Sequence, residues 1–409
     1  MSGSDLYGAW QKELAAYYTE RLRTITAHRV EGTILTPKGI GNTFPSWSPD
    51  GRRLAYCGSR SESYLTLTNL YLYDAATQKS KLLKAGVHSQ LSWSRDGKRL
   101  TYSRIERGRH GSHFSDLYVY DVERKKEKQL SRQLRAVDPD WAPDGTRIVC
   151  VTQKDGTDNL TLYSLDGTVE HLTRFENGEG LCTPRWSPDG RYIVFSQARN
   201  HGRDLVLYDL QTKTSRPLVA DKGDARDPVF SANGQQIYFS WDQTGIFNIY
   251  SVRLDGSERT LWTNVLGGAF MATVAADGKL AFSNFQYEGY KIAQIATPAA
   301  IAESLADYPM AGKGVALADN DFDVAEPDAA VQNARHYDDR VLPEKEIKPY
   351  EMTYGQVSFL PRALVDYNTL KLGTYFYAAD IINRYSMFGG VTLNSRQDLD
   401  AFAIFEMRK

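Results

Sequence analysis

The sequence predicts an all-β protein whose main part is a six-bladed β-propeller closed by an N-terminal strand. The prediction starts from one hairpin, in which an apolar strand ends at Trp47, turns through Pro49, Asp50 and Gly51, and returns as a second apolar strand. Proline and aspartate suit the central positions of a type I turn, and glycine adopts the left-handed conformation that follows. The hairpin comes back five more times, so that its glycine stands at Gly51, Gly97, Gly145, Gly190, Gly234 and Gly278.

The spacing of these glycines is that of propeller blades. Successive glycines lie 46, 48, 45, 44 and 44 residues apart, and a strand-rich period in the mid-forties is the length of one four-stranded blade. The sixth repeat has no fourth strand after Ile295, whereas residues 32–36 resemble a fourth strand that stands alone before the first repeat. We therefore expect the N-terminal strand to complete the last blade and to remove the open sheet edges.

The segments around the repeat have a different character. Leu6, Trp10 and Leu14 begin a stripe at helical spacing, which predicts a short amphipathic helix packed on its own domain, with partner docking as the alternative. The C-terminal segment holds strands of eight to nine residues, a length that fits outer-membrane strands. The expected organisation is a helix in 1–28, the propeller in 29–298, an acidic and proline-containing linker in 299–350, and a β-rich fragment in 351–409.

Composition narrows the classes of function. The 409 residues carry a formal net charge of −1, so no global field attracts nucleic acid, and we expect no nucleic-acid partner. Three cysteines are too few for a disulfide framework, and Cys57 and Cys150 are expected to be buried thiols. The chain has no run of about 20 apolar residues and shows no export signal. It is therefore expected to be either cytoplasmic or a segment of a longer protein.

Four sequence patterns bear on catalysis and metal binding. The Gly-x-Ser-x-Gly nucleophile motif and the His-Glu-x-x-His zinc motif do not occur, so we expect no enzyme activity and no cofactor. His110 and His113 form a close pair without a third ligand, and 319–323 begins like a calcium loop. That loop has Val324 where glycine is required and Ala330 where glutamate is required. No metal site is expected.

The repeat Trp-Ser-Pro-Asp-Gly-(Arg/Lys)-x-(Leu/Ile)-x-(Tyr/Phe), seen at Trp47 and Trp186, resembles the TolB-type WD40-like propeller repeats over residues 33–297. Arg95 departs from the motif, and Val274 replaces the aromatic residue of the sixth repeat, so this blade should be the least well specified. The resemblance implies a fold that is used for binding and for catalysis alike. Members of the family proper carry an N-terminal α/β domain, for which this chain has only the helix. The C-terminal segment resembles the start of an outer-membrane β-barrel of the surface-antigen type, which implies a part of a longer envelope protein in the periplasm or outer membrane.

Loop lengths indicate a binding face. From the hairpin glycine to the tyrosine of the third strand, the six repeats need 22, 23, 18, 18, 16 and about 15 residues, so the first two blades carry extra loop residues. Insertions on one face of a propeller often mark the binding face. Cationic and aromatic side chains there suit an acidic peptide, a carboxylate or a glycan phosphate, and ordinary charged loops are the alternative. The candidate ligand-binding residues are Arg107, Arg109, His110, His113, Phe114, Arg199, His201 and Arg203.

These observations favour a non-enzymatic propeller, expected to be monomeric, that binds an envelope protein or peptide in a Gram-negative cell. The C-terminal segment adds the expectation of outer-membrane association. An accessory propeller that docks or gates a peptidase elsewhere in a longer parent protein is the alternative function. A cytoplasmic interaction propeller is a third hypothesis, favoured by the missing export signal and disfavoured by the C-terminal strands.

Overall fold

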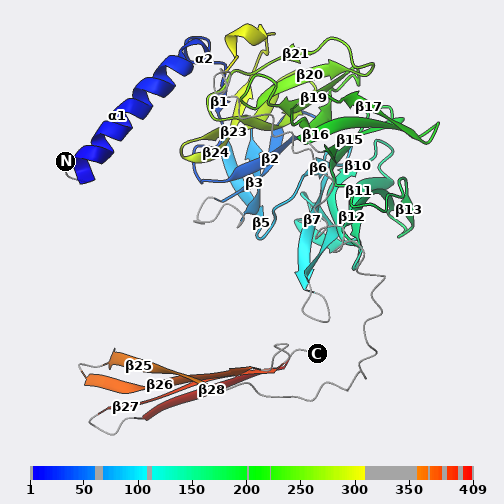
Figure 1. Ribbon diagram of the computed structural model, residues 1–409. Helices are drawn as coiled ribbons and strands as arrows, with labels where there is room; N and C mark the ends of the chain where they lie inside the picture. The colour runs from blue at the N-terminus through cyan, green and yellow to red at the C-terminus, as the bar shows by residue number, and fades with distance from the viewer. Residues whose placement is uncertain are drawn as a thin grey trace, which may run out of the picture. The chain divides into compact units, whose positions relative to one another are not determined.

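The computed structural model describes residues 3–59, 68–107, 113–199, 202–221, 223–308, 357–366, 369–379, 385–394 and 399–407. The chain divides into two compact units, which Figure 1 colours along the sequence. The first contains Met1–Glu106 and His113–Ala311, and the second contains Arg107–Ser112 and Gly312–Lys409. Most of the expected linker, residues 309–350, lies outside the described residues.

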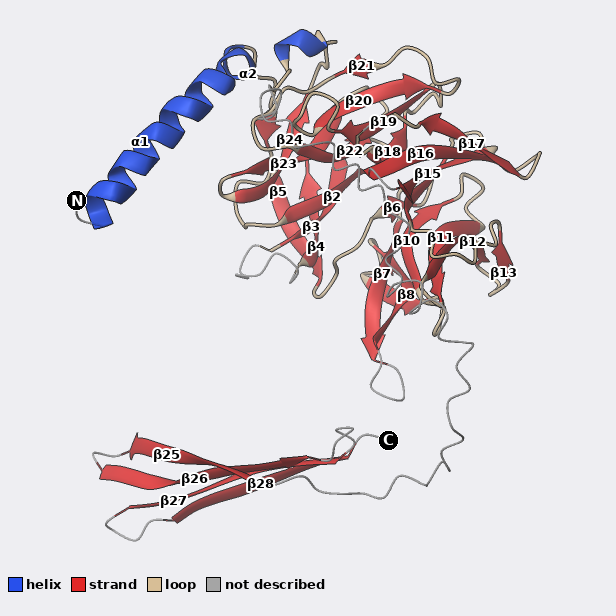
Figure 2. Cartoon of the chain, in the orientation of Figure 1, coloured by secondary structure: helices blue, strands red, loops and turns tan. Residues whose placement is uncertain are grey.

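The first unit is a propeller, as the repeat predicts. Its described residues form six sheets of four antiparallel strands each (Figure 2). The strands of each blade are named from the innermost to the outermost. The first blade has β2 (Asn42–Trp47), β3 (Arg53–Gly58), β4 (Asn69–Asp74) and β5 (Lys79–Lys84); the second has β6 (Ser92–Trp93), β7 (Arg99–Arg107), β8 (His113–Asp121) and β9 (Lys126–Gln129); the third has β10 (Ala136–Trp141), β11 (Arg147–Lys154), β12 (Thr157–Ser164) and β13 (Val169–His171).

The remaining three blades repeat this plan. The fourth has β14 (Leu181–Trp186), β15 (Tyr192–Arg199), β16 (Gly202–Asp209) and β17 (Thr214–Val219); the fifth has β18 (Arg226–Phe230), β19 (Gln236–Trp241), β20 (Asn248–Arg253) and β21 (Thr260–Leu261); the sixth has β22 (Ala269–Val274), β23 (Leu280–Gln286), β24 (Gly289–Ile295) and β1 (Thr33–Ile34).

The ring is closed by the N-terminal strand, which confirms the expectation from the unpaired sixth repeat. β1 pairs with β24 through Thr33 opposite Gln294 and Ile34 opposite Ala293. The contact is close at Gly32, whose φ is +70° and where an added Cβ would meet the Gln294 carbonyl oxygen at 2.6 Å. Glycine is therefore required at the entry to the closing strand.

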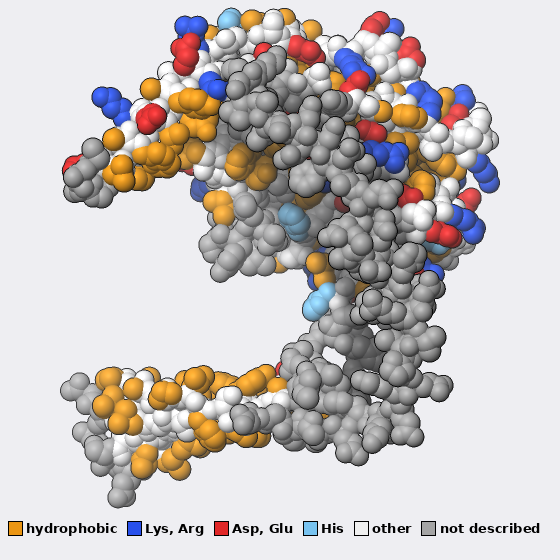
Figure 3. All heavy atoms as spheres, viewed as in Figure 1, with side chains coloured by type: hydrophobic (Ala, Val, Ile, Leu, Met, Phe, Trp, Pro, Cys, Tyr) orange, Lys and Arg blue, Asp and Glu red, His pale blue; other side chains and the backbone are white. Residues whose placement is uncertain are grey.

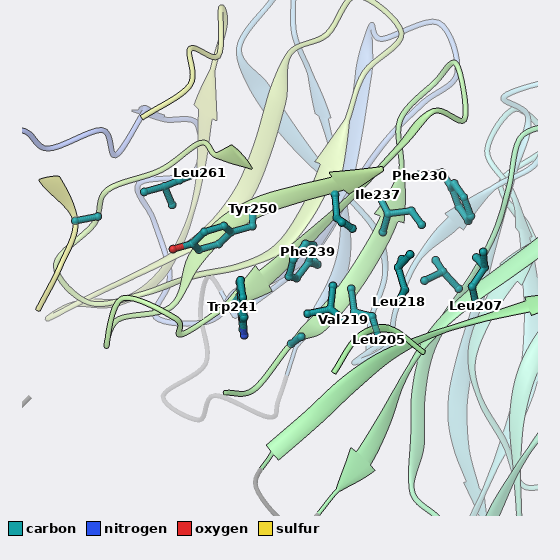
Figure 4. Close-up of a cluster of buried hydrophobic side chains, with 14 residues drawn as sticks. Leu205, Leu207, Leu218, Val219, Phe230, Ile237, Phe239, Trp241, Tyr250 and Leu261 are labelled. Carbon is teal, nitrogen blue, oxygen red and sulfur yellow. The ribbon is translucent and has the colours of Figure 1, made fainter. Parts of the chain in front are cut away.

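Hydrophobic clusters fill the space between neighbouring blades. Figure 4 shows the cluster between blades four and five, where Phe239, Trp241 and Tyr250 of the fifth blade meet Leu205 and Leu207 of the fourth. Arginines two residues after the hairpin glycine add a second link. Arg53, Arg99 and Arg147 place their guanidinium carbons 5.2, 5.0 and 5.4 Å from the ring centroids of the next blade's tryptophan. The blades are thus joined by burial and by cation–π contacts.

The hairpin aspartates are turn formers, as expected. Asp50 Oδ1 accepts hydrogen bonds from Ser48 Oγ at 2.5 Å and from the Arg52 backbone N–H at 3.1 Å. The Ser48 hydrogen bond holds the pKa of Asp50 below its ordinary value. Asp96, Asp189 and Asn233 make the same pair of contacts.

The N-terminal residues form two helices, α1 (Gly3–Arg21) and α2 (Arg23–Ala27). The expected packing of an apolar stripe on the propeller holds only for Ile25 of α2, which is buried, whereas Leu6, Trp10 and Tyr18 of α1 are exposed. A short 3-10 helix, η1 (Glu303–Leu305), follows the last blade. Among the described helices, none has the length and apolar character needed to cross a bilayer.

The second unit contains one antiparallel sheet of four consecutive strands. They are β25 (Ser358–Asp366), β26 (Thr369–Ala379), β27 (Tyr385–Asn394) and β28 (Leu399–Met407), hydrogen-bonded in this order.

Candidate functional site

The two ends of the propeller differ in what they present. At one end lie the six hairpins that join the first and second strands of each blade. At the other end lie the connections between blades and the loops between second and third strands, and we call this end the loop face. A pocket of about 590 Å³ opens on the loop face and is lined by three blades. Its described lining residues are Phe44, Thr68, Asn69, Gly86, His88, Ser89, Ser103, Arg104, Ile105, Ser115, Val137 and Asp138.

Backbone bulges aim two of these side chains. The inner strand of the first blade shifts register between Thr43 and Ser46, and that of the third blade shifts between Val137 and Asp140. At each shift one residue has a left-handed backbone, with φ of +52° at Phe44 and +51° at Asp138. Such bulges redirect a side chain and are common next to functional sites.

His88 presents a hydrogen-bond acceptor to this pocket. Its ring lies 5.5 Å from the Phe44 ring, edge to face, and its Nδ1 lies 3.1 Å from Thr68 Oγ1. The Thr68 hydroxyl donates its proton to the Val87 carbonyl oxygen at 2.5 Å, so His88 Nδ1 must be the donor in its contact with Thr68. Burial lowers the pKa of His88. The imidazole is therefore neutral at pH 7, with Nε2 available to accept a hydrogen bond.

The cationic side of the pocket is internally neutralised. Arg104 Nη1 donates to both carboxylate oxygens of Glu127, each at 3.1 Å. Lys84 Nζ and the Tyr102 hydroxyl bind the same carboxylate at 2.8 and 2.6 Å. Arg104 also lies 5.3 Å from the centre of the Tyr118 ring. This wall is thus held rigidly and carries little free positive charge.

The central channel narrows beneath the loop face. Gln90 Nε2 reaches from the second blade to the carbonyl oxygens of Pro139 and Pro184, at 3.3 and 3.2 Å. Arg185 Nη1 reaches back from the fourth blade to the Leu91 carbonyl oxygen at 3.2 Å and pairs with Asp140 at 3.1 Å. The space left at this level is about 10 Å³, room for about one water molecule.

Acidic side chains lie deep in the same region. Asp138 Oδ2 accepts the Thr183 backbone N–H at 3.0 Å, and Asp227 Oδ2 accepts that of Met271 at 3.3 Å. Burial raises the pKa of both carboxyls; that of Asp227 reaches about 6, with Arg226 opposing the rise. These carboxylates link the inner strand of the third blade to that of the fourth and the inner strand of the fifth blade to that of the sixth, and they make these two links sensitive to protonation.

A second space opens at the hairpin end of the channel. This cavity of about 420 Å³ is lined by all six repeats, and it includes the tryptophans and the residue before each hairpin aspartate or asparagine. At that position stand Pro49, Arg95, Pro143, Pro188, Ala232 and Ala276. The hairpin face is therefore hollowed too, although its aspartates serve the turns.

The predicted binding residues are only partly described. His113 and Phe114 begin β8, Arg199 ends β15, and Arg203 lies near the start of β16, so all four lie at strand ends on the loop face. Arg109, His110 and His201 lie outside the described residues, as does the side chain of Arg107.

The structure does not bring the described members of this set into one cluster. Phe114 packs under Arg135, with 4.6 Å between the guanidinium carbon and the ring centre. Arg199 pairs with Asp204, with 3.4 Å between Nε and Oδ2. Arg203 Nη1 donates to both carboxylate oxygens of Asp224, at 3.0 and 3.2 Å. The second-blade and fourth-blade residues thus have separate partners, and each described arginine is already paired.

The sequence pattern does not mark Phe44, His88, Ile105 and Asp138 as pocket residues. One feature of the sequence could have pointed to two of them. Phe44 and Asp138 each precede a proline of the inner strand and lie three residues before the tryptophan of their repeat. Their role depends on the bulge, which a hydrophobic pattern does not reveal.

Comparisons with known proteins agree with this fold. Residues 116–308 match the family model of the TolB beta propeller domain. Over 183 residues the chain is 26% identical to the Tol-Pal system protein TolB of Francisella tularensis subsp. holarctica, covering 44% of this chain and 39% of that protein. Over 139 residues it is 27% identical to dipeptidyl-peptidase 5 of Porphyromonas gingivalis, covering 32% of this chain and 20% of that protein.

Each of these matches spans less than half of the relative's length. Among solved structures, the crystal structure of TolB from Acinetobacter baumannii aligns with a TM-score of 0.49 and 20% identity, covering 57% of each chain. The family match begins within β8 and ends after η1, and the same repeat continues through the blades that precede it. Residues 116–308 are therefore similar to the TolB β-propeller domain.

Proposed function

We propose that this propeller is a non-enzymatic module that binds an extended segment of a protein partner in the Gram-negative envelope, through the loop-face pocket. The observation that carries the proposal is the combination in that pocket of apolar side chains with an imidazole nitrogen, Nε2 of His88, to which no described residue donates a hydrogen bond. Phe44, Ile105 and Val137 offer apolar surface, and Nε2 of His88 can accept a hydrogen bond from a bound segment. An extended peptide supplies both complements, an apolar side chain and a backbone N–H.

The hydrogen bonds of Ser89, a hydroxyl that lines the pocket, favour binding over catalysis. The Ser89 hydroxyl donates to the Gln90 carbonyl oxygen at 2.9 Å and accepts the Ser103 backbone N–H at 2.9 Å. Its contacts are thus with backbone and with the Ser103 hydroxyl, and none of these groups is a base that would activate a nucleophile. The paired arginines also shift the proposed ligand away from a strongly acidic segment and towards one that is apolar with hydrogen-bond donors.

The location in the periplasm or outer membrane is part of this proposal. It is supported by the similarity to a Tol-Pal system protein and by the character of the C-terminal strands.

A photo-crosslinker at Ile105 tests the binding proposal. Ile105 lines the pocket and is exposed, whereas Leu82 is an exposed residue of β5 that does not line it. A crosslinker at Ile105 in intact Gram-negative cells is expected to capture a discrete protein that the Leu82 probe does not capture. Adding His88→Ala to the Ile105 probe should reduce that product about tenfold, because the partner loses its hydrogen bond to Nε2 and its contact with the ring. A product that is equal from both positions, or unchanged by His88→Ala, contradicts the proposal.

A second candidate function is an accessory propeller that docks or gates a peptidase. The similarity to a protein named dipeptidyl-peptidase 5 favours it. This candidate predicts that the captured protein hydrolyses peptides and that His88→Ala changes its rate when both are mixed. A captured protein without peptidase activity leaves the first candidate in place.

A further inference from the structure

The sheet of β25–β28 has two faces that differ in chemistry, and its register defines them. Residues opposite each other on paired strands share a face. Leu372 lies opposite Ala363 and Leu393, and Leu393 lies opposite Leu399. The face that contains them, here called the apolar face, has no charged side chain among the described residues of the four strands. Its exposed members include Phe359, Val365, Leu372, Leu393, Leu399 and Phe405, and Figure 3 shows hydrophobic side chains gathered over these strands.

The charged side chains of the sheet all lie on the other face, here called the mixed face. There Lys371 Nζ donates to Asp400 Oδ2 at 2.8 Å, and the Arg362 guanidinium lies 4.8 Å from the centre of the Tyr375 ring. The apolar face has hydroxyls at Thr374 and Tyr385, and that of Thr374 donates to the Leu360 carbonyl oxygen at 3.0 Å. The described charged side chains of the sheet are therefore gathered on the mixed face, whereas the apolar face carries only neutral groups.

We propose that the apolar face lies against lipid hydrocarbon. The four strands contain 9, 11, 10 and 9 residues, and a strand of about 9–11 residues crosses the hydrocarbon core of a bilayer. A protein-binding patch has a polar rim around an apolar centre, whereas here the absence of charge extends over the described length of all four strands. The observation is independent of the propeller and of its proposed ligand.

The membrane-bound sheet must also satisfy its edges. Open strand edges do not occur in hydrocarbon, because unpaired backbone groups cost several kcal/mol each there. β25 and β28 are the outer strands of the described sheet, so in lipid they pair with additional strands.

Two adjacent residues of β28 give a matched test. Phe405 on the apolar face and Ile404 on the mixed face are each 58% exposed. The full chain, purified in a mild detergent, is reconstituted with vesicles of phosphatidylcholine and phosphatidylethanolamine and separated by flotation. The wild-type chain should float with the vesicles. Phe405→Arg should lower the ratio of bound to free protein about tenfold or more, the penalty for arginine on a lipid-facing strand. Ile404→Arg should leave the ratio within about twofold of wild type.

A second measurement keeps the test independent of misfolding. A polarity-sensitive dye is attached to Phe405→Cys or Ile404→Cys. Burial raises the pKa of each native thiol, Cys57, Cys150 and Cys182, to about 12, which keeps them poorly reactive. The dye at position 405 should shift to the blue on addition of vesicles, and the dye at position 404 should not. Equal shifts, a chain that stays free of vesicles, or a blue shift caused by dimerisation without lipid would each overturn the proposal.

Discussion

The blades of the propeller and the C-terminal sheet are built from the same local element, a meander of four antiparallel strands, yet they treat apolar side chains in opposite ways. In the fifth blade, Phe239 and Trp241 of β19 are almost completely buried between neighbouring sheets, whereas Phe405 of β28 is 58% exposed. The strand pattern does not make this difference. It arises because each blade packs against neighbouring blades, whereas none of the hydrophobic clusters formed by the described residues contains a residue of the C-terminal sheet.

The largest test of this comparison is truncation of one aromatic residue in each region. Phe239→Ala should lower the free energy of unfolding by about 3–5 kcal/mol, because it removes a buried ring and leaves a cavity. Phe405→Ala should change it by less than about 0.5 kcal/mol. Urea denaturation followed by intrinsic fluorescence measures both. Similar losses for the two variants would show that the C-terminal sheet has a packed partner in solution.

The closure of the ring is the next test, because the C-terminal sheet has no equivalent of it. Gly32→Ala should cost about 2–3 kcal/mol, since a Cβ there would collide with the Gln294 carbonyl oxygen. Gly145 has the same φ of +70° and nothing within 4 Å of an added Cβ, so Gly145→Ala should cost only about 1 kcal/mol. The thermal midpoint of the propeller measures the difference. Equal shifts would mean that the closing strand contributes little to stability.

The third test compares one carboxyl group from each region, Asp227 and Asp400. Their contributions to the free energy of unfolding change with pH in opposite directions. The pKa of Asp227 in the fold, about 6, lies above its unfolded value of about 3.9. The folded state therefore binds more protons between these values, and the stability contribution falls as pH rises through this window. Asp227→Asn should add about 2 kcal/mol above pH 6, after allowance for its partial exposure to the channel, and nothing below about pH 4.

Asp400 is the contrasting group. Its hydrogen bond with Lys371 holds its pKa below the ordinary value, so its contribution is present above the unfolded pKa and is lost as pH falls. Asp400→Asn should therefore show no gain at neutral pH. Denaturation curves from about pH 4 to about pH 8 separate the two variants. A pH-independent effect of Asp227→Asn would contradict the assigned protonation.

The smallest expected effect concerns the arginines that lie on aromatic rings in both regions. Arg99→Ala should cost about 1 kcal/mol, because the guanidinium lies between two blades on Trp141. Arg99→Lys should recover part of this, and Arg362→Ala in the C-terminal sheet should cost about 0.5 kcal/mol at its more exposed ring. Urea denaturation of the three variants provides the values. If Arg362→Ala lowered the free energy of unfolding as much as Arg99→Ala, the arginine contact between blades would stabilise the fold no more than the contact within the C-terminal sheet.

Much of the propeller could be predicted from the sequence because its information is local and repeated. A turn of Asp50 and Gly51 fixes its hairpin wherever it occurs, and six copies at a constant period fix the number of blades. The unpaired strand at residues 32–36 likewise predicted its pairing with β24. The exposure of α1 could not be predicted, since an amphipathic stripe does not reveal whether a partner is present.

The candidate site shows the same division between what the sequence predicts and what it does not. The sequence determined that the chain repeats one hairpin six times, that the ring must close through its N-terminal strand, and that its longest loops share a face. Tertiary structure alone decided that Phe44, His88 and Asp138, which come from three blades, line one pocket, and that Arg203 is already paired with Asp224. Contacts of this kind depend on bulges and on distances between strands far apart in the chain, and neither is encoded in the period of the repeat.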